Sequence, residues 1–186
     1  MCREFILFIT LVWPVALFAN DTLLQFYRPY TETTHHPAAV IVAKKAGECW
    51  QQSQRIVRED AWRCSAEGKN YDPCFVKPFG DHLNAICPES PWTANSVQIT
   101  VNTPLDNSNH ATLDMSRGYP WAIELANGVK CQATDSGESY DDLPVRYRCN
   151  EQSVLFGHIQ RCAVAWKMLQ HNASGTSTVV IEKVWF

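Results

Sequence analysis

Cysteine is the residue type whose number and spacing most directly suggest chemistry in this chain. Seven of its eight cysteines follow residue 48, and neighbouring ones lie ten or more residues apart. Structural zinc sites use pairs of cysteines with only about two to four residues between them. Disulfide bonds are therefore the favoured interpretation for an exported chain, and a zinc site is the alternative.

The cysteine spacing favours bridges between neighbours along the chain. The predicted pairs are Cys49 with Cys64, Cys74 with Cys87, and Cys131 with Cys149. Six cysteines can pair in many other ways, and these stay open. Each predicted loop is of a size for which a bridge stabilises the fold by about 3 kcal/mol on the chain-entropy model.

The odd cysteine, Cys162, is predicted to be a free thiol. In a strand from Cys162 to Leu169 it would share a face with Val164, Trp166 and Met168, and this face is the more apolar one. We therefore expect the thiol to be buried and unreactive. A disulfide between two copies of the chain is the alternative.

Residues 1–19 have the composition of a secretory signal peptide. Arg3 precedes an apolar run over residues 5–18, and Ala19 is a small residue suited to cleavage. The run is shorter than the roughly 20 residues that span a membrane, so we expect cleavage near Ala19, with an uncleaved anchor as the alternative. The protein would then be secreted or periplasmic. The expected organisation is a signal peptide (1–19), an irregular N-terminal arm (20–37) and a single disulfide-containing β-rich domain (38–186).

No residues have the local spacing of a catalytic or metal site. No serine lies in a G-x-S-x-G motif, and no histidine pair has metal-ligand spacing. The pair His35–His36 is better interpreted as solvated residues on the arm. His158 and Cys162 have an H-x₃-C spacing, which alone does not make a nucleophile. The acidic pairs Glu59–Asp60 and Asp141–Asp142 are each adjacent in sequence, which argues against a glycosidase pair. We predict no catalytic residue, cofactor or metal.

Aromatic residues give the other functional signal. Exposed Trp and Tyr rings bind sugars or protein partners by stacking and apolar burial. Six tryptophans follow residue 20, and we expect four or five to fill the core and one or two to lie exposed at a site. They are Trp50, Trp62, Trp92, Trp121, Trp166 and Trp185.

The charge pattern excludes two classes of partner. The formal net charge is −3 and no basic stripe stands out, which argues against nucleic acid and against docking on an anionic membrane. After the signal peptide, no segment approaches 18 consecutive apolar residues, so we expect no membrane association after cleavage.

Short strands separated by turn signals must position these residues. Apolar or alternating segments predict strands at residues 38–43, 97–101, 120–125, 145–149, 154–156, 162–169 and 178–186. In the cysteine-rich part, residues 47–92, Gln51 to Trp62 is the one segment that could form a helix. The fold class is therefore mostly β, an antiparallel sheet curled into a small sandwich or barrel with a disulfide-stapled N-terminal half, and α+β is the alternative.

Asn127-Gly128 is the strongest hairpin signal in the sequence. A three-residue loop over 126–128 would place Leu125 opposite Val129 and Ile123 opposite Cys131. This register gathers the apolar side chains on one face, so burial should select it, with Gly128 in the left-handed region.

A series of short motifs runs in order through residues 45–186. It comprises G-x-C-W at 47–50, D-A-W-R-C at 60–64, D-P-C-F at 72–75, C-P at 87–88, P-W at 120–121, L-x-N-G-x-x-C at 125–131 and Y-x-C at 147–149. The series resembles a family of small secreted bacterial proteins of uncharacterised function. Cys162 departs from the family pattern. The resemblance implies export and identifies no catalytic residue.

These observations together predict an exported, non-catalytic domain that binds a protein or a glycan. A secreted hydrolase without a local signature is one alternative, and a structural or host-facing exported protein is another. A pocket lined by histidines and carboxylates would favour the enzyme, whereas an exposed aromatic patch would favour binding. The ligand and the oligomeric state do not follow from the sequence.

Overall fold

The computed structural model describes residues 21–30, 39–150, 152–161 and 164–186, and it is built from strands alone within these ranges. No helix of the described residues is long and apolar enough to cross a membrane. The mostly β fold class is confirmed. The segment Gln51 to Trp62, the one that could have formed a helix, does not form one: Ser53 accepts hydrogen bonds from the backbone N–H groups of Arg55 and Ile56 at 3.1 and 3.2 Å, which closes a turn instead.

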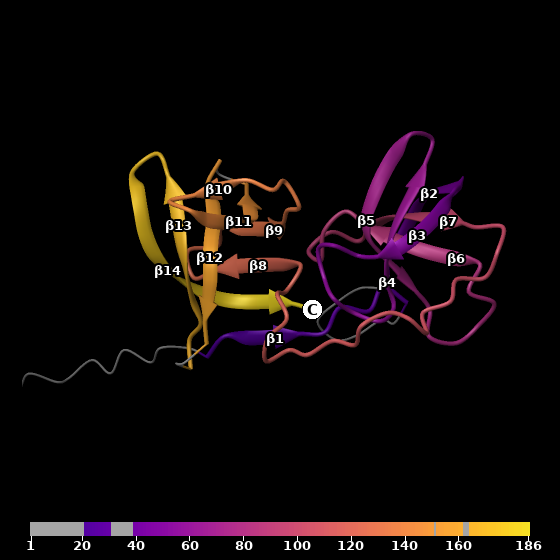
Figure 1. Cartoon of the computed structure of the whole chain (residues 1–186), viewed down its shortest axis with the longest axis horizontal. Helices are drawn as coiled ribbons and strands as arrows, with labels where there is room; N and C mark the ends of the chain where they lie inside the picture. The colour runs from indigo at the N-terminus through magenta and orange to yellow at the C-terminus, as the bar shows by residue number, and fades with distance from the viewer. Residues whose placement is uncertain (1–20, 31–38, 151, 162–163) are drawn as a thin grey trace, which may run out of the picture.

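The C-terminal half forms a closed, six-stranded antiparallel barrel, drawn in orange and yellow in Figure 1. Its strands, in the order in which they pair, are β8 (Ala122–Leu125), β9 (Lys130–Ala133), β11 (Leu143–Cys149), β12 (Val154–Gln160), β13 (Lys167–Asn172) and β14 (Gly175–Trp185). The long β14 closes the barrel because its first half pairs with β13 and its second half pairs with β8. The short β10 (Ser139–Tyr140) pairs with β11.

The N-terminal half forms a second, six-stranded sheet, drawn in magenta in Figure 1. Its strands, in pairing order, are β2 (Val40–Ala46), β7 (Asn95–Thr100), β6 (Asn84–Pro88), β5 (Lys69–Val76), β4 (Ala61–Ala66) and β3 (Glu48–Gln52). The pairing of β2 with β7 is parallel, and the other pairings are antiparallel. The two outer strands, β2 and β3, are separated only by Gly47, so the sheet must curl.

Gly47 lies where the chain passes from one outer strand to the other. A Cβ atom at this position would lie 2.2 Å from the carbonyl oxygen of Ser65 and 3.0 Å from Cγ2 of Ile99. Gly47→Ala should therefore lower the free energy of unfolding by about 1–3 kcal/mol, the usual cost of overpacking. Urea denaturation measures the change. The neighbouring, exposed Ala46→Ser is the control and should change stability by less than about 0.5 kcal/mol; equal effects of the two would contradict the steric explanation.

The three disulfides join strands that pair directly. They are Cys49–Cys64, Cys74–Cys87 and Cys131–Cys149, the pairs that the spacing favours. Cys49 is the register partner of Cys64 on β3 and β4, and Cys131 is that of Cys149 on β9 and β11. Such bridges form where the chain meets an oxidising environment, which indicates an extracytoplasmic location.

The hairpin at Asn127-Gly128 has the predicted three-residue loop. Leu125 donates its N–H to the carbonyl of Val129 at 2.9 Å, and Ile123 lies opposite Cys131. Gly128 has a φ of +82°, as the loop requires. Since Leu125, Val129 and Cys131 are all buried, burial of one face selects this register, and the prediction is confirmed.

The strand predicted to begin at Cys162 begins instead at Lys167. Val164 is 62 % exposed, whereas Ala165 is buried, which is the opposite of the predicted phase. The alternation fails because residues 164–166 are not part of the strand. Cys162 itself lies outside the described residues, and so do the signal peptide and the pair His35–His36.

Aromatic packing joins the barrel to the second sheet. The rings of Tyr27, Phe75 and Trp121 contact one another, with centroids 5.2–5.9 Å apart. Tyr27 follows β1 (Leu23–Gln25), which runs parallel to the end of β14, while Phe75 belongs to β5. Figure 1 shows β1 running along the barrel and the end of β14 pointing toward the second sheet. A core cluster therefore crosses from one sheet to the other.

Candidate binding pocket at the junction of the two sheets

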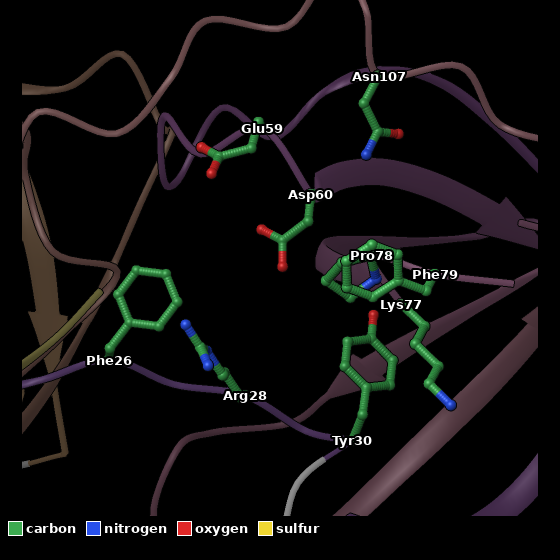
Figure 2. Close-up of a pocket in the computed structure, with 9 residues that line it drawn as sticks. All are labelled: Phe26, Arg28, Tyr30, Glu59, Asp60, Lys77, Pro78, Phe79 and Asn107. Carbon is green, nitrogen blue, oxygen red and sulfur yellow. The ribbon is translucent and has the colours of Figure 1, made fainter.

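A cavity of about 620 Å³ opens beside this junction (Figure 2). Its volume falls in the range of about 300–1,000 Å³ that small-molecule sites occupy. Three chain segments build it: the stretch after β1, the turn before β4 and the stretch after β5. One further residue, Asn107, comes from the loop that follows β7. The lining residues are Phe26, Arg28, Tyr30, Glu59, Asp60, Lys77, Pro78, Phe79 and Asn107.

Arg58 lies behind the pocket wall and fixes its geometry. It is fully buried, and its guanidinium donates to both carboxylate oxygens of Asp60, at 2.5 and 2.7 Å. It also donates to the main-chain oxygens of Tyr27 and Phe186, at 2.7 and 3.0 Å. Because Tyr27 and Phe186 extend the barrel strands β1 and β14 while Asp60 precedes β4, this one side chain joins the two sheets.

Aromatic rings form the apolar part of the pocket. Phe26 is 43 % exposed, and its ring centroid lies 4.9 Å from the Arg28 guanidinium carbon and 4.6 Å from that of Arg58. Phe79, in the stretch after β5, is 84 % exposed. A phenyl ring this exposed buries little apolar surface in the folded protein, and its face is available to stack on a ligand.

Asn107 and Glu59 contribute polar groups that the protein leaves partly unused. The Oδ1 atom of Asn107 accepts a hydrogen bond from the indole N–H of Trp62 at 3.1 Å, so its NH₂ group is the end that faces the pocket (Figure 2). Glu59 accepts from the N–H of Leu113 through Oε2 at 3.2 Å, which leaves Oε1 as an acceptor. The pocket thus offers both donors and acceptors.

Tyr30 completes the polar lining. Its hydroxyl is buried and has no hydrogen-bond partner among the described residues, and Figure 2 shows it pointing into the group of lining side chains. Burial is the main cause that raises the pKa of this hydroxyl far above its usual value, and the charge of Asp60 raises it further. The phenol therefore keeps its proton at neutral pH, and it can donate a hydrogen bond to a ligand oxygen. An unpaired buried hydroxyl is costly, so a ligand that pairs with it gains affinity.

The lining combines exposed rings with two carboxyl groups, a phenol, an amide and two cationic side chains. None of the lining residues is a serine, threonine, cysteine or histidine, so no Ser–His or Cys–His pair lies among them. Glu59 and Asp60 do both line the pocket, which their adjacency in sequence did not suggest. Both oxygens of Asp60 accept hydrogen bonds from Arg58, so this carboxylate belongs to the link between the two sheets.

The tryptophans lie elsewhere. Trp62, Trp121 and Trp185 are buried, Trp92 and Trp166 are half-buried, and Trp50 is 46 % exposed. The expected division into four or five structural rings and one or two exposed rings is confirmed, whereas a site at the exposed ring stays a prediction, and none of the six lines the pocket. The pocket aromatics escaped the sequence analysis. Their signal was a proline next to an aromatic residue in a polar stretch, in Pro29-Tyr30 and Pro78-Phe79.

Three cysteines come close enough for a metal site. The sulfur atoms of Cys64, Cys74 and Cys87 lie within 4.8 Å of one another in the core of the second sheet. All three belong to disulfides, and a metal ligand must be a thiolate. In this oxidised form the cluster stabilises the fold.

Comparisons of the chain with protein-family models, with curated proteins and with solved structures gave no match.

Proposed function

We propose that this chain is an exported, non-catalytic binding domain that holds a glycan in the pocket between its two sheets. The observation that carries the proposal is the combination of exposed aromatic rings with unpaired donors and acceptors in one cavity. Sugars present apolar C–H faces, which stack on rings, and hydroxyls, which both donate and accept. Phe26 and Phe79 supply the rings. Tyr30 and Asn107 supply donors, and Glu59 supplies an acceptor.

Export is the second part of the proposal. The signal-like composition of residues 1–19 supports it, and so do the three disulfides, which need an oxidising compartment. The resemblance to small secreted bacterial proteins also supports export out of the cytoplasm.

A protein partner is the second candidate, and Trp50 favours it. This ring is 46 % exposed on β3, an outer strand of the second sheet, beside a shallow groove of about 450 Å³. Outer strands carry free backbone groups that another chain can pair with, and tryptophan is enriched among binding hot spots.

Binding of the oxidised protein to an array of immobilised oligosaccharides tests the proposal. Phe79→Ala should weaken binding to the retained glycans by about tenfold or more, as expected for an aromatic hot spot. Asn107→Asp should weaken it by roughly twofold to tenfold, because this change keeps the acceptor for Trp62 and replaces only the donor in the pocket.

Trp50→Ala is the matched control, since it removes an exposed aromatic ring that does not line the pocket. It should leave glycan binding unchanged. Retention of no oligosaccharide, or equal binding by the wild type and Phe79→Ala, would reject the glycan assignment. Loss of binding in Trp50→Ala alone would move the site to β3.

A further inference from the structure

Four side chains of the barrel form a cluster that the pocket does not include: Tyr119, Arg146, His158 and Arg161, named here the Tyr119 cluster. The guanidinium carbons of Arg146 and Arg161 lie 4.4 and 5.8 Å from the centre of the Tyr119 ring. The Tyr119 hydroxyl lies 2.9 Å from Nδ1 of His158. Two permanent cations and one imidazole therefore surround a single ring.

Two interruptions of the barrel strands bring these side chains together. The register between β11 and β12 shifts between Val145 and Tyr147, so Arg146 lies at a bulge. The register between β12 and β13 is irregular between Phe156 and Gln160, which includes His158. The bend there requires Gly157, whose φ is +76°. Bulges redirect a side chain out of the regular alternation, and they occur often beside binding sites.

No carboxylate of the described residues pairs with the two arginines of the cluster. Four other arginines of the described residues each have a carboxylate within 4.0 Å: Arg58, Arg63, Arg117 and Arg148. Within the same described residues, Arg146 and Arg161 have none, and neither do Arg28 and Arg55. Their Nε atoms are buried and lack hydrogen-bond partners, and Arg161 donates through Nη2 to the carbonyl of Gly118. What distinguishes Arg146 and Arg161 is that both lie over the ring of Tyr119.

The cluster is also reachable from solvent. His158 is exposed, and Tyr119, Arg146 and Arg161 are half-buried. Partly desolvated guanidinium groups bind anions more strongly than fully exposed ones, since water screens them less. A planar carboxylate is satisfied by one guanidinium fork, whereas a phosphate or sulfate group has enough oxygens for two arginines and an imidazole.

We propose that the Tyr119 cluster is a binding site for a tetrahedral oxyanion, a phosphate or sulfate group, held by Arg146 and Arg161 with His158 as a third donor. The proposal does not depend on the glycan pocket, whose lining residues are all different.

Calorimetric titration of the full chain with sodium phosphate and with sodium sulfate tests it, at an ionic strength matched with sodium chloride. We expect saturable binding of at least one oxyanion. Arg146→Gln and Arg161→Gln should each weaken it by about tenfold or more, the effect of losing a charge-assisted hydrogen bond. Arg148→Gln is the matched control, because it removes the same charge from the same strand but from an exposed side chain that pairs with Glu138. It should change the affinity by less than twofold.

One further variant and one further ligand complete the test. Arg161→Lys keeps the charge and should still weaken binding, which separates the guanidinium fork from charge alone and gives a variant less disturbed in folding. Glucose 6-phosphate compared with inorganic phosphate distinguishes an esterified group from a free ion as the natural ligand. No binding beyond that of chloride would overturn the proposal, and so would an equal loss in Arg148→Gln and Arg146→Gln.

Discussion

Replacing Arg58 by methionine is expected to lower the free energy of unfolding by about 3–5 kcal/mol, the cost of removing one partner from a buried ion pair. The side chain is fully buried and donates to four oxygens, those of Asp60, Tyr27 and Phe186. Methionine fills a similar volume but leaves the Asp60 carboxylate and the main-chain oxygen of Tyr27 without the Arg58 donor, whereas the Phe186 oxygen keeps the N–H of Tyr27 at 2.6 Å. The guanidinium also lies 4.2 Å from the centre of the Phe75 ring, a contact that methionine replaces only in part.

Urea denaturation of the oxidised protein measures this effect. Arg117→Met is the control, because the Arg117 side chain is 90 % exposed, and it should change stability by no more than about 0.5 kcal/mol. Arg58→Met combined with Asp60→Leu should recover part of the loss, since no unpaired charge is then left buried. A loss below about 1 kcal/mol in Arg58→Met would show that Arg58 does not join the sheets.

Removing the barrel disulfide by Cys131→Ala with Cys149→Ala should lower the free energy of unfolding by about 3 kcal/mol, from the entropy of a loop of this size. The bridge spans 18 residues and joins directly paired positions of β9 and β11. Cys131 is fully buried, so the substitution also leaves a small void beside Ile123. The fold should survive, because the barrel stays closed through β8 and β14.

Urea denaturation under non-reducing conditions again gives the measurement. The conservative control is Cys131→Ser with Cys149→Ser, which should lose at least as much, since it buries hydroxyls in place of sulfur. If the alanine pair loses less than about 1 kcal/mol, the bridge contributes little and the sheet alone determines the stability of the barrel.

Local features of this fold could be predicted from the sequence. The hairpin at Asn127-Gly128 and its register follow from the turn residues and from the alternation around them, within fewer than fifteen residues. The pairs Cys49–Cys64 and Cys131–Cys149 link neighbouring strands, so nearness in sequence matches nearness in space.

Long-range features could not be predicted, because no local pattern encodes them. The parallel pairing of β1 with the end of β14 joins Leu23 to Lys183, and only the closed barrel brings these together. The strand predicted from Cys162 had the right composition, but residues 164–166 are irregular and the strand begins at Lys167.

The pocket was missed for a related reason. Its walls come from segments around residues 26–30, 59–60 and 77–79, each unremarkable alone. Arg58, in a charged stretch before Asp60, has the sequence context of a surface residue, yet it is fully buried. The turn at Ser53 and the burial of Arg58 also explain why the segment between Gln51 and Trp62 does not form a helix.

Mapping of backbone amide chemical shifts by two-dimensional NMR tests the central claim, a glycan site between the two sheets, most directly. The ¹⁵N-labelled, oxidised protein is titrated with the oligosaccharide that the array retains best. The amides of Phe26, Arg28, Phe79 and Asn107 should shift together with one dissociation constant, because these residues line one cavity from three separate segments. Shifts confined to Trp50 and its neighbours on β3, or no shifts at saturating glycan, would contradict the account.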